Sequence, residues 1–274
     1  MATARTDLAM ESGGLFQGKN VEGVLLEQRD CQGWQVTQVQ VTTPQGAEEL
    51  GKPMGTYLTL ELGDFANAGS DALERGVAAV ADLLTQLLPP QLEGDALVVG
   101  LGNRLITPDA IGPRCVDRVL VTRHLEGDFF PVAALATGVL GTTGYESSAL
   151  VAAMTQKLRP GFVIAVDALC ARSLNRLCTT IQLSDTGIVP GSGIGNARKA
   201  LSKETLGVPV IALGVPTVVD GASMAQNEDG MEQMLLTPKD IDSQITLLSR
   251  VLGYGINAAL HPNLTVADMD YLLS

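Results

Sequence analysis

Short, almost uninterrupted apolar runs alternate with helix-like segments in the second part of the chain. This alternation constrains the fold more than any other feature. A strand that is apolar on both faces needs cover on both, as in a parallel sheet with crossover helices. The sequence therefore predicts an α/β fold with a mostly parallel central sheet flanked by helices. The expected strands are residues 96–101, 132–136, 162–166, 180–183 and 208–213, and the expected helices are residues 113–124, 147–158 and 237–260.

The first hundred residues follow a different pattern. Runs rich in β-branched residues at 24–28, 34–41 and 57–62 are separated by turn residues such as Asp30, Gly33, Pro44 and Gly46, which predicts a small antiparallel β element. Apolar side chains at helical spacing predict a helix over 71–88, with Asp71 and Glu74 able to form its cap. Residues 1–20 are polar and glycine-rich, so we expect a flexible leader.

Composition excludes several classes of protein. The 274 residues include 18 Lys and Arg against 30 Asp and Glu, a formal net charge of −12 that disfavours direct binding of nucleic acid. No apolar run approaches the roughly 18–20 residues of a membrane span, so we expect no membrane partner. The four cysteines have no CxxC spacing, which favours reduced thiols in a cytoplasmic compartment.

Three aspartates follow predicted strands, at the edge of the sheet where α/β proteins place their sites. They are Asp109, Asp167 and Asp185. A buried carboxylate costs free energy, and two close carboxylates raise the pKa of one member so that the pair shares a proton. Such a pair can act as general base and general acid. Taken singly, each aspartate is explained as simply by helix capping, and Asp109 lies four residues before Pro113.

Other motifs are weaker. Gly100-x-Gly102 lacks the third glycine of a dinucleotide loop, because position 105 is Leu. Asp185-Thr-Gly matches the tripeptide of pepsin-like proteases, which need two such elements in an all-β fold, and this chain has one. The chain has two histidines, His124 and His261, so the sequence gives little support for a histidine-based triad or a multi-histidine metal site. We expect His124 to lie at the end of a helix.

Long segments around these aspartates resemble the spore germination protease family of spore-forming Firmicutes. The resemblance covers nearly the whole chain. It is carried by Arg-Thr-Asp-Leu-Ala at 5–9, Thr-Pro-Asp-Ala-Ile-Gly-Pro at 107–113, Val-Ile-Ala-Val-Asp-Ala-Leu-Cys-Ala-Arg-Ser at 163–173, and the run from 179 to 196 that contains Ser-Asp-Thr-Gly-Ile-Val-Pro-Gly-Ser-Gly.

This resemblance implies an endopeptidase of an atypical aspartic type, a hydrolase that degrades small acid-soluble spore proteins during germination. It implies Asp109 and Asp167 as the catalytic pair, with Asp185 as a residue of the wall, and it requires no cofactor and no metal. The implied assembly is a homotetramer in the cytoplasm of the forespore or spore core. The fold implied is that of the hydrogenase-maturation endopeptidases.

The family is made as a zymogen that trims its own N-terminus within the Arg-Thr-Asp-Leu-Ala segment. By that match the bond cleaved here joins Asp7 and Leu8. Residues 1–7 are then a short propeptide, and residues 8–274 form a single catalytic α/β domain. The segment after Asp220 is shorter than in better-known members of the family.

Our hypothesis for the mechanism is a water molecule held between Asp109 and Asp167. One carboxylate takes a proton from the water, and the other carboxyl donates to the carbonyl oxygen and later to the amine. We expect the cleft and its oxyanion donors to involve Gly102, Asn103, Gly141 and Thr142. One alternative is a metal-dependent maturation-type endopeptidase, with His124 or His261 as a third ligand. Another is a non-catalytic relative on the same scaffold.

Overall fold

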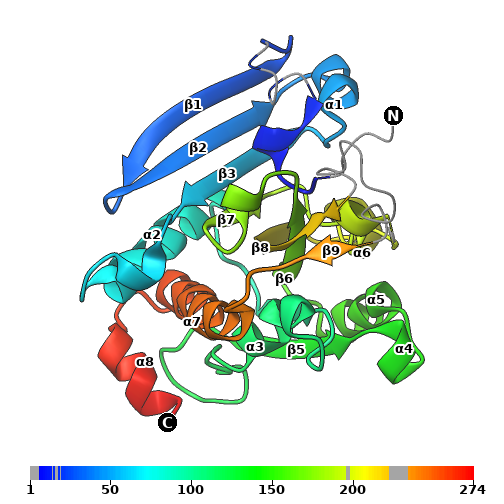
Figure 1. The fold of residues 1–274 in the computed structure, drawn as a ribbon. Coiled ribbons are helices and arrows are strands. Elements are labelled where there is room, and N and C mark those ends of the chain that lie inside the picture. Colours follow the sequence, from blue (N-terminus) through cyan, green and yellow to red (C-terminus); the bar gives the residue numbers. More distant parts are fainter. Residues whose placement is uncertain (1–5, 14, 16–17, 19, 196–197, 222–233) are drawn as a thin grey trace.

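The computed structural model describes residues 6–13, 15, 18, 20–195, 198–221 and 234–274. Within them, one nine-stranded sheet has the order β1-β2-β3-β7-β8-β6-β4-β5, and β9 pairs with β8 (Figure 1). The strands are β1 (Val24–Cys31), β2 (Trp34–Val41), β3 (Gly55–Glu61), β4 (Ala96–Leu101), β5 (Val132–Gly138), β6 (Phe162–Ala171), β7 (Thr180–Ser184), β8 (Val210–Asp220) and β9 (Leu235–Leu236).

The sheet has a parallel half and an antiparallel half. Strands β8, β6, β4 and β5 are parallel to one another. Strands β1, β2, β3 and β7 pair antiparallel, and β7 is also antiparallel to β8. The predicted α/β class and the antiparallel start are thus confirmed, whereas β7, which was expected among the parallel strands, is antiparallel to both of its neighbours. The structure adds that the antiparallel strands continue the central sheet through the pairing of β3 with β7.

Helices cover both faces of the parallel half. The main helices are α2 (Ala72–Leu87), α3 (Ile111–Val116), α5 (Ser147–Leu158) and α7 (Ile241–Leu260), and shorter ones are α1 (Pro44–Leu50), α4 (Leu140–Thr143), α6 (Lys203–Leu206) and α8 (Val266–Leu272). In β4, Val98 packs into the core cluster with α2, α3 and α7, and Val99 packs into the cluster with α5. Alternate side chains of one strand therefore reach two cores, which is why the run is apolar throughout.

Two predicted helix bounds are wrong. Helix α3 ends at Val116 rather than at residue 124, because the Asn257 side chain of α7 binds the following backbone, accepting from the Leu120 N–H and donating to the Arg118 carbonyl. His124 therefore lies in a turn and not at a helix end. Helix α7 begins at Ile241 rather than at residue 237, because the Thr237 hydroxyl donates to the Thr217 carbonyl of β8.

The cap predicted for α2 is also different. Asp71 occupies the N-cap position but its side chain makes no capping hydrogen bond, and it forms an ion pair with Arg75 instead. The turn expected around Pro44 and Gly46 is the start of α1, which Thr43 caps by accepting from the Gly46 N–H.

The expected flexible leader is wrong for residues 8–12. Leu8 and Ala9 are fully buried, and Ala9 begins a short 3₁₀ helix, η1 (Ala9–Glu11). The Glu11 carboxylate accepts from the backbone N–H groups of Arg172 and Ser173, directly after β6. Residues 8–12 are thus part of the folded core, while residues 1–5, 14, 16–17 and 19 of the predicted leader lie outside the described residues.

In the described part of the chain, we find no helix with both the length and the apolar character needed to cross a membrane.

Candidate active site

Asp167 occupies a gap in the parallel sheet. It lies within β6, paired with Gly214 of β8 on one side, whereas the pairing of β6 with β4 on the other side ends at Val166. The strand continues past Asp167 to Ala171. This aspartate therefore lies inside the strand, whereas the sequence pattern predicted that it follows the strand. Its side chain is 5 % exposed. A carboxyl group therefore stands at a buried strand position that has a backbone partner in β8 but none in β4.

The surroundings of Asp167 favour its protonated form. Burial raises the pKa of Asp167 well above its ordinary value, and the carboxylates of Asp109 and Asp7 raise this pKa further. The Ala168 N–H donates to Oδ1 of Asp167 at 2.9 Å, which opposes the shift. Asp167 thus combines desolvation with two neighbouring negative charges, the usual causes of a raised carboxyl pKa.

Asp109 reaches this place from the loop after β4. It ends the 3₁₀ helix η4 (Thr107–Asp109), and its Oδ2 accepts from the Asn103 N–H at 2.7 Å. Burial raises the pKa of Asp109, and the hydrogen bond from Asn103 lowers it. Gly102 has φ +110°, and a Cβ there would lie 2.1 Å from the Asp109 carbonyl oxygen. Glycine at position 102 therefore permits the loop to fold back on itself.

Direct contact between backbones sets the height of Asp109 above the sheet. A Cβ at Gly112, near the start of α3, would lie 2.3 Å from the carbonyl oxygen of Leu101 and 2.5 Å from that of Val166. A Cβ at Gly100 would lie 2.3 Å from the Gly112 carbonyl oxygen. Helix α3 therefore rests on the ends of β4 and β6 with no side chain between them. This close packing brings η4 against β6, which carries Asp167.

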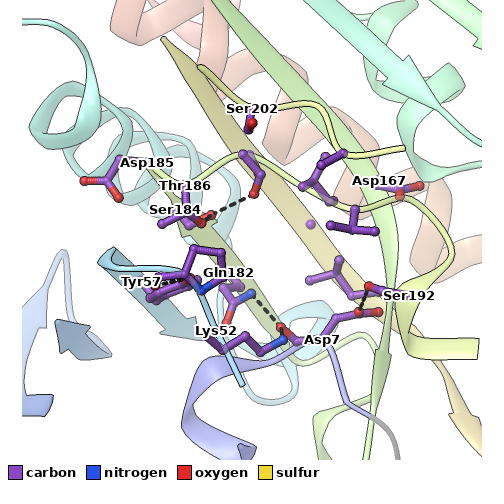
Figure 2. A pocket seen from close by; sticks show the side chains of 18 of the residues that line it. Asp7, Lys52, Tyr57, Asp167, Gln182, Ser184, Asp185, Thr186, Ser192 and Ser202 are labelled. Carbon is purple, nitrogen blue, oxygen red and sulfur yellow. Dashed lines mark hydrogen bonds between the residues drawn. The ribbon is translucent and has the colours of Figure 1, made fainter. Parts of the chain in front are cut away.

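A cavity of about 760 Å³ opens beside Asp167. Side chains from distant parts of the sequence point into it: Asp7, Lys52, Tyr57, Gln182 and Ser192 (Figure 2). Asp185 also lines the cavity, at its rim, where its exposed carboxylate accepts from the Thr56 N–H at 2.8 Å. The cavity therefore has a buried acid at one side and a set of hydrogen-bonding groups around it.

Thr6 and Asp7 of the N-terminal segment line this cavity. The Asp7 carboxylate accepts from the Cys170 N–H at 2.8 Å and from the Ser192 hydroxyl at 2.6 Å, and the Asp7 N–H donates to the Cys170 carbonyl. The Asp7 carbonyl oxygen accepts from Lys52 Nζ at 2.9 Å and from Gln182 Nε2 at 3.1 Å. The N–H, the carboxylate and the carbonyl oxygen of Asp7 are thus all hydrogen-bonded, so the carbonyl group of the Asp7–Leu8 peptide bond is fixed in position.

Four predicted site residues lie elsewhere. Gly102 and Asn103 contact Asp109, but the Asn103 N–H is already bound to that carboxylate. Gly141 and Thr142 belong to α4, where the Thr142 hydroxyl bonds to the backbone of Val139. None of the four is among the described residues that line the cavity, and neither is Asp109, whose charge acts on the cavity residue Asp167.

Sequence reasoning missed Lys52 and Gln182. Gln182 had a signal, because it is a polar side chain inside an otherwise apolar run and is now found 8 % exposed in β7. Lys52 had none, because it follows the helix α1 that the sequence pattern did not predict.

Neither histidine lines the cavity. His261 is the C-cap residue of α7, with its ring edge-on to Phe129, and burial lowers its pKa. Among the described residues, no group of three or more His, Cys, Asp or Glu side chains is placed to hold a metal ion. All four cysteines are buried and free.

Comparison with known proteins gives the following matches. The family model described as germination protease matches residues 4–232. The germination protease of Clostridium perfringens is 36 % identical over 325 aligned positions that cover 100 % of both chains. That of Bacillus cereus is 45 % identical over 241 positions, covering 82 % of this chain and 65 % of its own. Among solved structures, the [NiFe] hydrogenase maturation protease HycI from Thermococcus kodakarensis aligns with a TM-score of 0.40 and 15 % identity, over 64 % of this chain and 99 % of its own.

Proposed function

The chain belongs to the germination protease family, and from this membership we propose that it is an endopeptidase that hydrolyses small acid-soluble spore proteins during germination. The observation that carries the proposal is the buried acid Asp167, whose pKa is raised by the carboxylate of Asp109 and which lines a cavity together with Thr6 and Asp7 of the chain's own N-terminal segment. A protease needs a bound peptide bond and a group that activates water beside it. This site offers both.

We assign the two aspartates different roles. Asp109 is the less buried of the two and accepts a hydrogen bond from Asn103, so it is the better candidate for the ionised base. Asp167 is deeply buried beside two carboxylates, which favours the acid form. Asp109 takes a proton from water as the water oxygen attacks the carbonyl carbon. Asp167 supplies a proton to the substrate, at the carbonyl oxygen or at the leaving nitrogen.

We propose that the chain is a self-processing zymogen. Residues 1–7 are its propeptide and residues 8–274 its catalytic domain. The support is that Thr6 and Asp7 line the cavity, and that the Asp7–Leu8 peptide bond lies between the hydrogen-bonded Asp7 and the buried side chain of Leu8. A substrate protein needs the same space. Cleavage of this bond therefore clears the cavity and activates the enzyme.

We also propose a homotetramer in the forespore or spore core, because the family resemblance implies it. The exposed edge strand β1 is compatible with assembly, since Leu25 is 54 % and Leu26 49 % exposed there. The molar mass of the protein, measured by light scattering as it elutes from a size-exclusion column, tests this directly. A particle with four times the mass of the chain is expected, and a monomer would contradict it.

The test of the catalytic pair uses a purified small acid-soluble spore protein as substrate. Mass spectrometry of the digest should show fragments with the wild-type enzyme. Asp109→Asn and Asp167→Asn should each lower the rate by at least about 10²-fold, since general acid–base catalysis supplies about 10²–10⁴. The matched control is Asp128→Asn, because Asp128 is exposed in the loop before β5. This variant should cleave the substrate at the wild-type rate. Wild-type activity in either pair variant would refute the assignment.

A strong chelator distinguishes the metal-dependent alternative from the aspartate pair. Activity that survives a strong chelator supports the aspartate pair. Activity that is lost and then restored by added Zn²⁺ would favour the metal-dependent endopeptidase. A wild-type enzyme that is folded, free of residues 1–7 and still without activity on spore proteins would favour the non-catalytic relative.

A further inference from the structure

The carbonyl oxygen of Asp7 lies between two side chains that come from different parts of the sheet. Lys52, which lies between α1 and β3, donates from Nζ at 2.9 Å, and Gln182 on β7 donates from Nε2 at 3.1 Å (Figure 2). If the cavity is the protease site proposed above, residues 6–9 stand for a bound substrate. The Asp7 carbonyl then stands for the carbonyl of the bond to be cleaved.

Gln182 spans this peptide bond with one side chain. Its Nε2 donates to the carbonyl of Asp7, before the bond, and its Oε1 accepts from the Ala9 N–H at 2.7 Å, after the bond. Because Gln182 is 8 % exposed in the middle of β7, its amide is fixed and desolvated. It therefore sets the register of the bound segment as well as binding the carbonyl.

Lys52 brings a positive charge to the same oxygen. It follows Gly51, the left-handed C-cap of α1 with φ 68°, which turns the chain toward the cavity. Its Nζ also donates to the Thr6 carbonyl at 3.3 Å, so the ammonium group binds two successive carbonyls. Burial lowers the pKa of Lys52 and the Asp7 carboxylate raises it. A partly desolvated ammonium acts on nearby charge more strongly than one in open water.

The residues on either side of the bond are anchored as well. The Asp7 backbone is bound to Cys170 and its carboxylate to Ser192, while Leu8 is fully buried in an apolar cluster with Leu169 and Leu177. The carbonyl oxygen is thus presented to its two donors with little freedom to move away. Such preorganised donors are the requirement for stabilising an oxyanion.

We propose that Lys52 and Gln182 bind the carbonyl oxygen of the peptide bond that is cleaved and stabilise the oxyanion formed on it. The water oxygen bonds to the carbonyl carbon, and the C=O π electrons move to the oxygen held by Lys52 and Gln182. The proton from the water goes to Asp109. When the oxyanion collapses, the C–N bond breaks and the nitrogen takes the Asp167 proton. Because Lys52 and Gln182 stabilise the oxyanion, Asp167 does not need to protonate the carbonyl oxygen. Its role is therefore to give its proton to the leaving nitrogen.

The test measures kcat and KM on a spore-protein peptide, with enzyme already freed of residues 1–7. Lys52→Met should lower kcat by about 10²–10³-fold, the cost of losing one oxyanion donor, and change KM little. Lys52→Arg should recover part of this loss because it restores a cationic donor. Gln182→Leu should lower kcat by about 10²-fold and also raise KM, because it loses the contact to the N–H after the bond. The matched control is Lys157→Met, exposed on α5, with wild-type constants expected.

A structural role would give a different result. In an Asp109→Asn background, which binds but does not cleave, Lys52→Met should leave the Kd for the peptide within about threefold if the contact acts mainly in the transition state. Folded Lys52→Met and Gln182→Leu enzymes with wild-type kcat would overturn the inference, even while Asp167→Asn is inactive and the proposed function stands. Activity of Asp109→Asn and Asp167→Asn at the wild-type level would instead overturn the proposed function. If Lys52→Met fails to fold, Lys52→Gln provides the same comparison.

Discussion

Asp167 carries a carboxyl group inside β6, a strand whose other residues are apolar. It is inside β6 and 5 % exposed, and its charged form is disfavoured by burial and by the carboxylates of Asp109 and Asp7. Protein sites that hold a group in an unfavourable state trade stability for function. At the scale of one residue, the strand is therefore less stable than an apolar version would be.

This predicts that Asp167→Asn stabilises the fold at neutral pH. The raised pKa means that the folded protein binds this proton more tightly than the unfolded chain, whose pKa is about 3.9. The contribution of Asp167 to the free energy of unfolding is fully present below that value and declines as the pH rises toward the folded pKa. Thermal melts should show a higher Tm for the variant at pH 7 and a shrinking difference toward pH 4. Asp128→Asn serves as the control, and a lower Tm for Asp167→Asn at pH 7 would contradict the account.

At the scale of elements, the position of Asp109 depends on the contact of α3 with the ends of β4 and β6. Gly112 has backbone carbonyls at 2.3 and 2.5 Å from where its Cβ would be, so no side chain fits. Gly112→Ala should push α3 and η4 away from the sheet. Overpacking of this kind costs about 1–3 kcal/mol of stability. We expect kcat to fall as well, because the carboxyl of Asp109 moves relative to Asp167.

The control for this prediction is Gly255→Ala, whose Cβ would lie 2.4 Å from Val80 where α7 packs on α2. It should lower Tm by a similar amount without lowering kcat of the folded enzyme. Equal loss of kcat in both variants would show that α3 does not position Asp109 specifically.

The elements also show what a sequence can reveal. Strands such as β4 and helices such as α5 were predictable because the pattern of their apolar residues is local and typical of that kind of element. The end of α3 was not, because it depends on Asn257, which is far away in sequence and binds the backbone after the helix. For the same reason the sequence pointed to Asp109 and Asp167 at neighbouring strands, but not to Lys52 and Gln182, which meet only through the pairing of β3 with β7.

At the scale of the whole molecule, the N-terminal segment is part of the fold and also contributes Thr6 and Asp7 to the lining of the cavity. Leu8 and Ala9 pack into two apolar clusters, so they remain buried after a cut at Asp7–Leu8. Thr6 and Asp7 contribute mainly hydrogen bonds to the cavity wall. Removal of residues 1–7 should therefore open the cavity while leaving the fold intact.

This predicts that a chain beginning at Leu8 binds a spore-protein peptide with a lower Kd than the full chain. The full chain must first move residues 6 and 7 away from the cavity, so the peptide competes with a tethered segment. Both forms carry Asp167→Asn, so that neither trims itself nor cleaves the peptide, and a binding titration gives the two Kd values. Equal Kd values would contradict competition between the peptide and residues 6 and 7.

The most direct test of the aspartate pair is the fate of the bond that lies in the cavity. Purified wild-type and Asp167→Asn proteins are incubated under the same conditions, and intact-mass spectrometry follows the loss of residues 1–7. We expect a wild-type product that begins at Leu8 and an Asp167→Asn protein that keeps its full mass. Trimming of Asp167→Asn at the wild-type rate, or wild-type cleavage at a different bond, would contradict it.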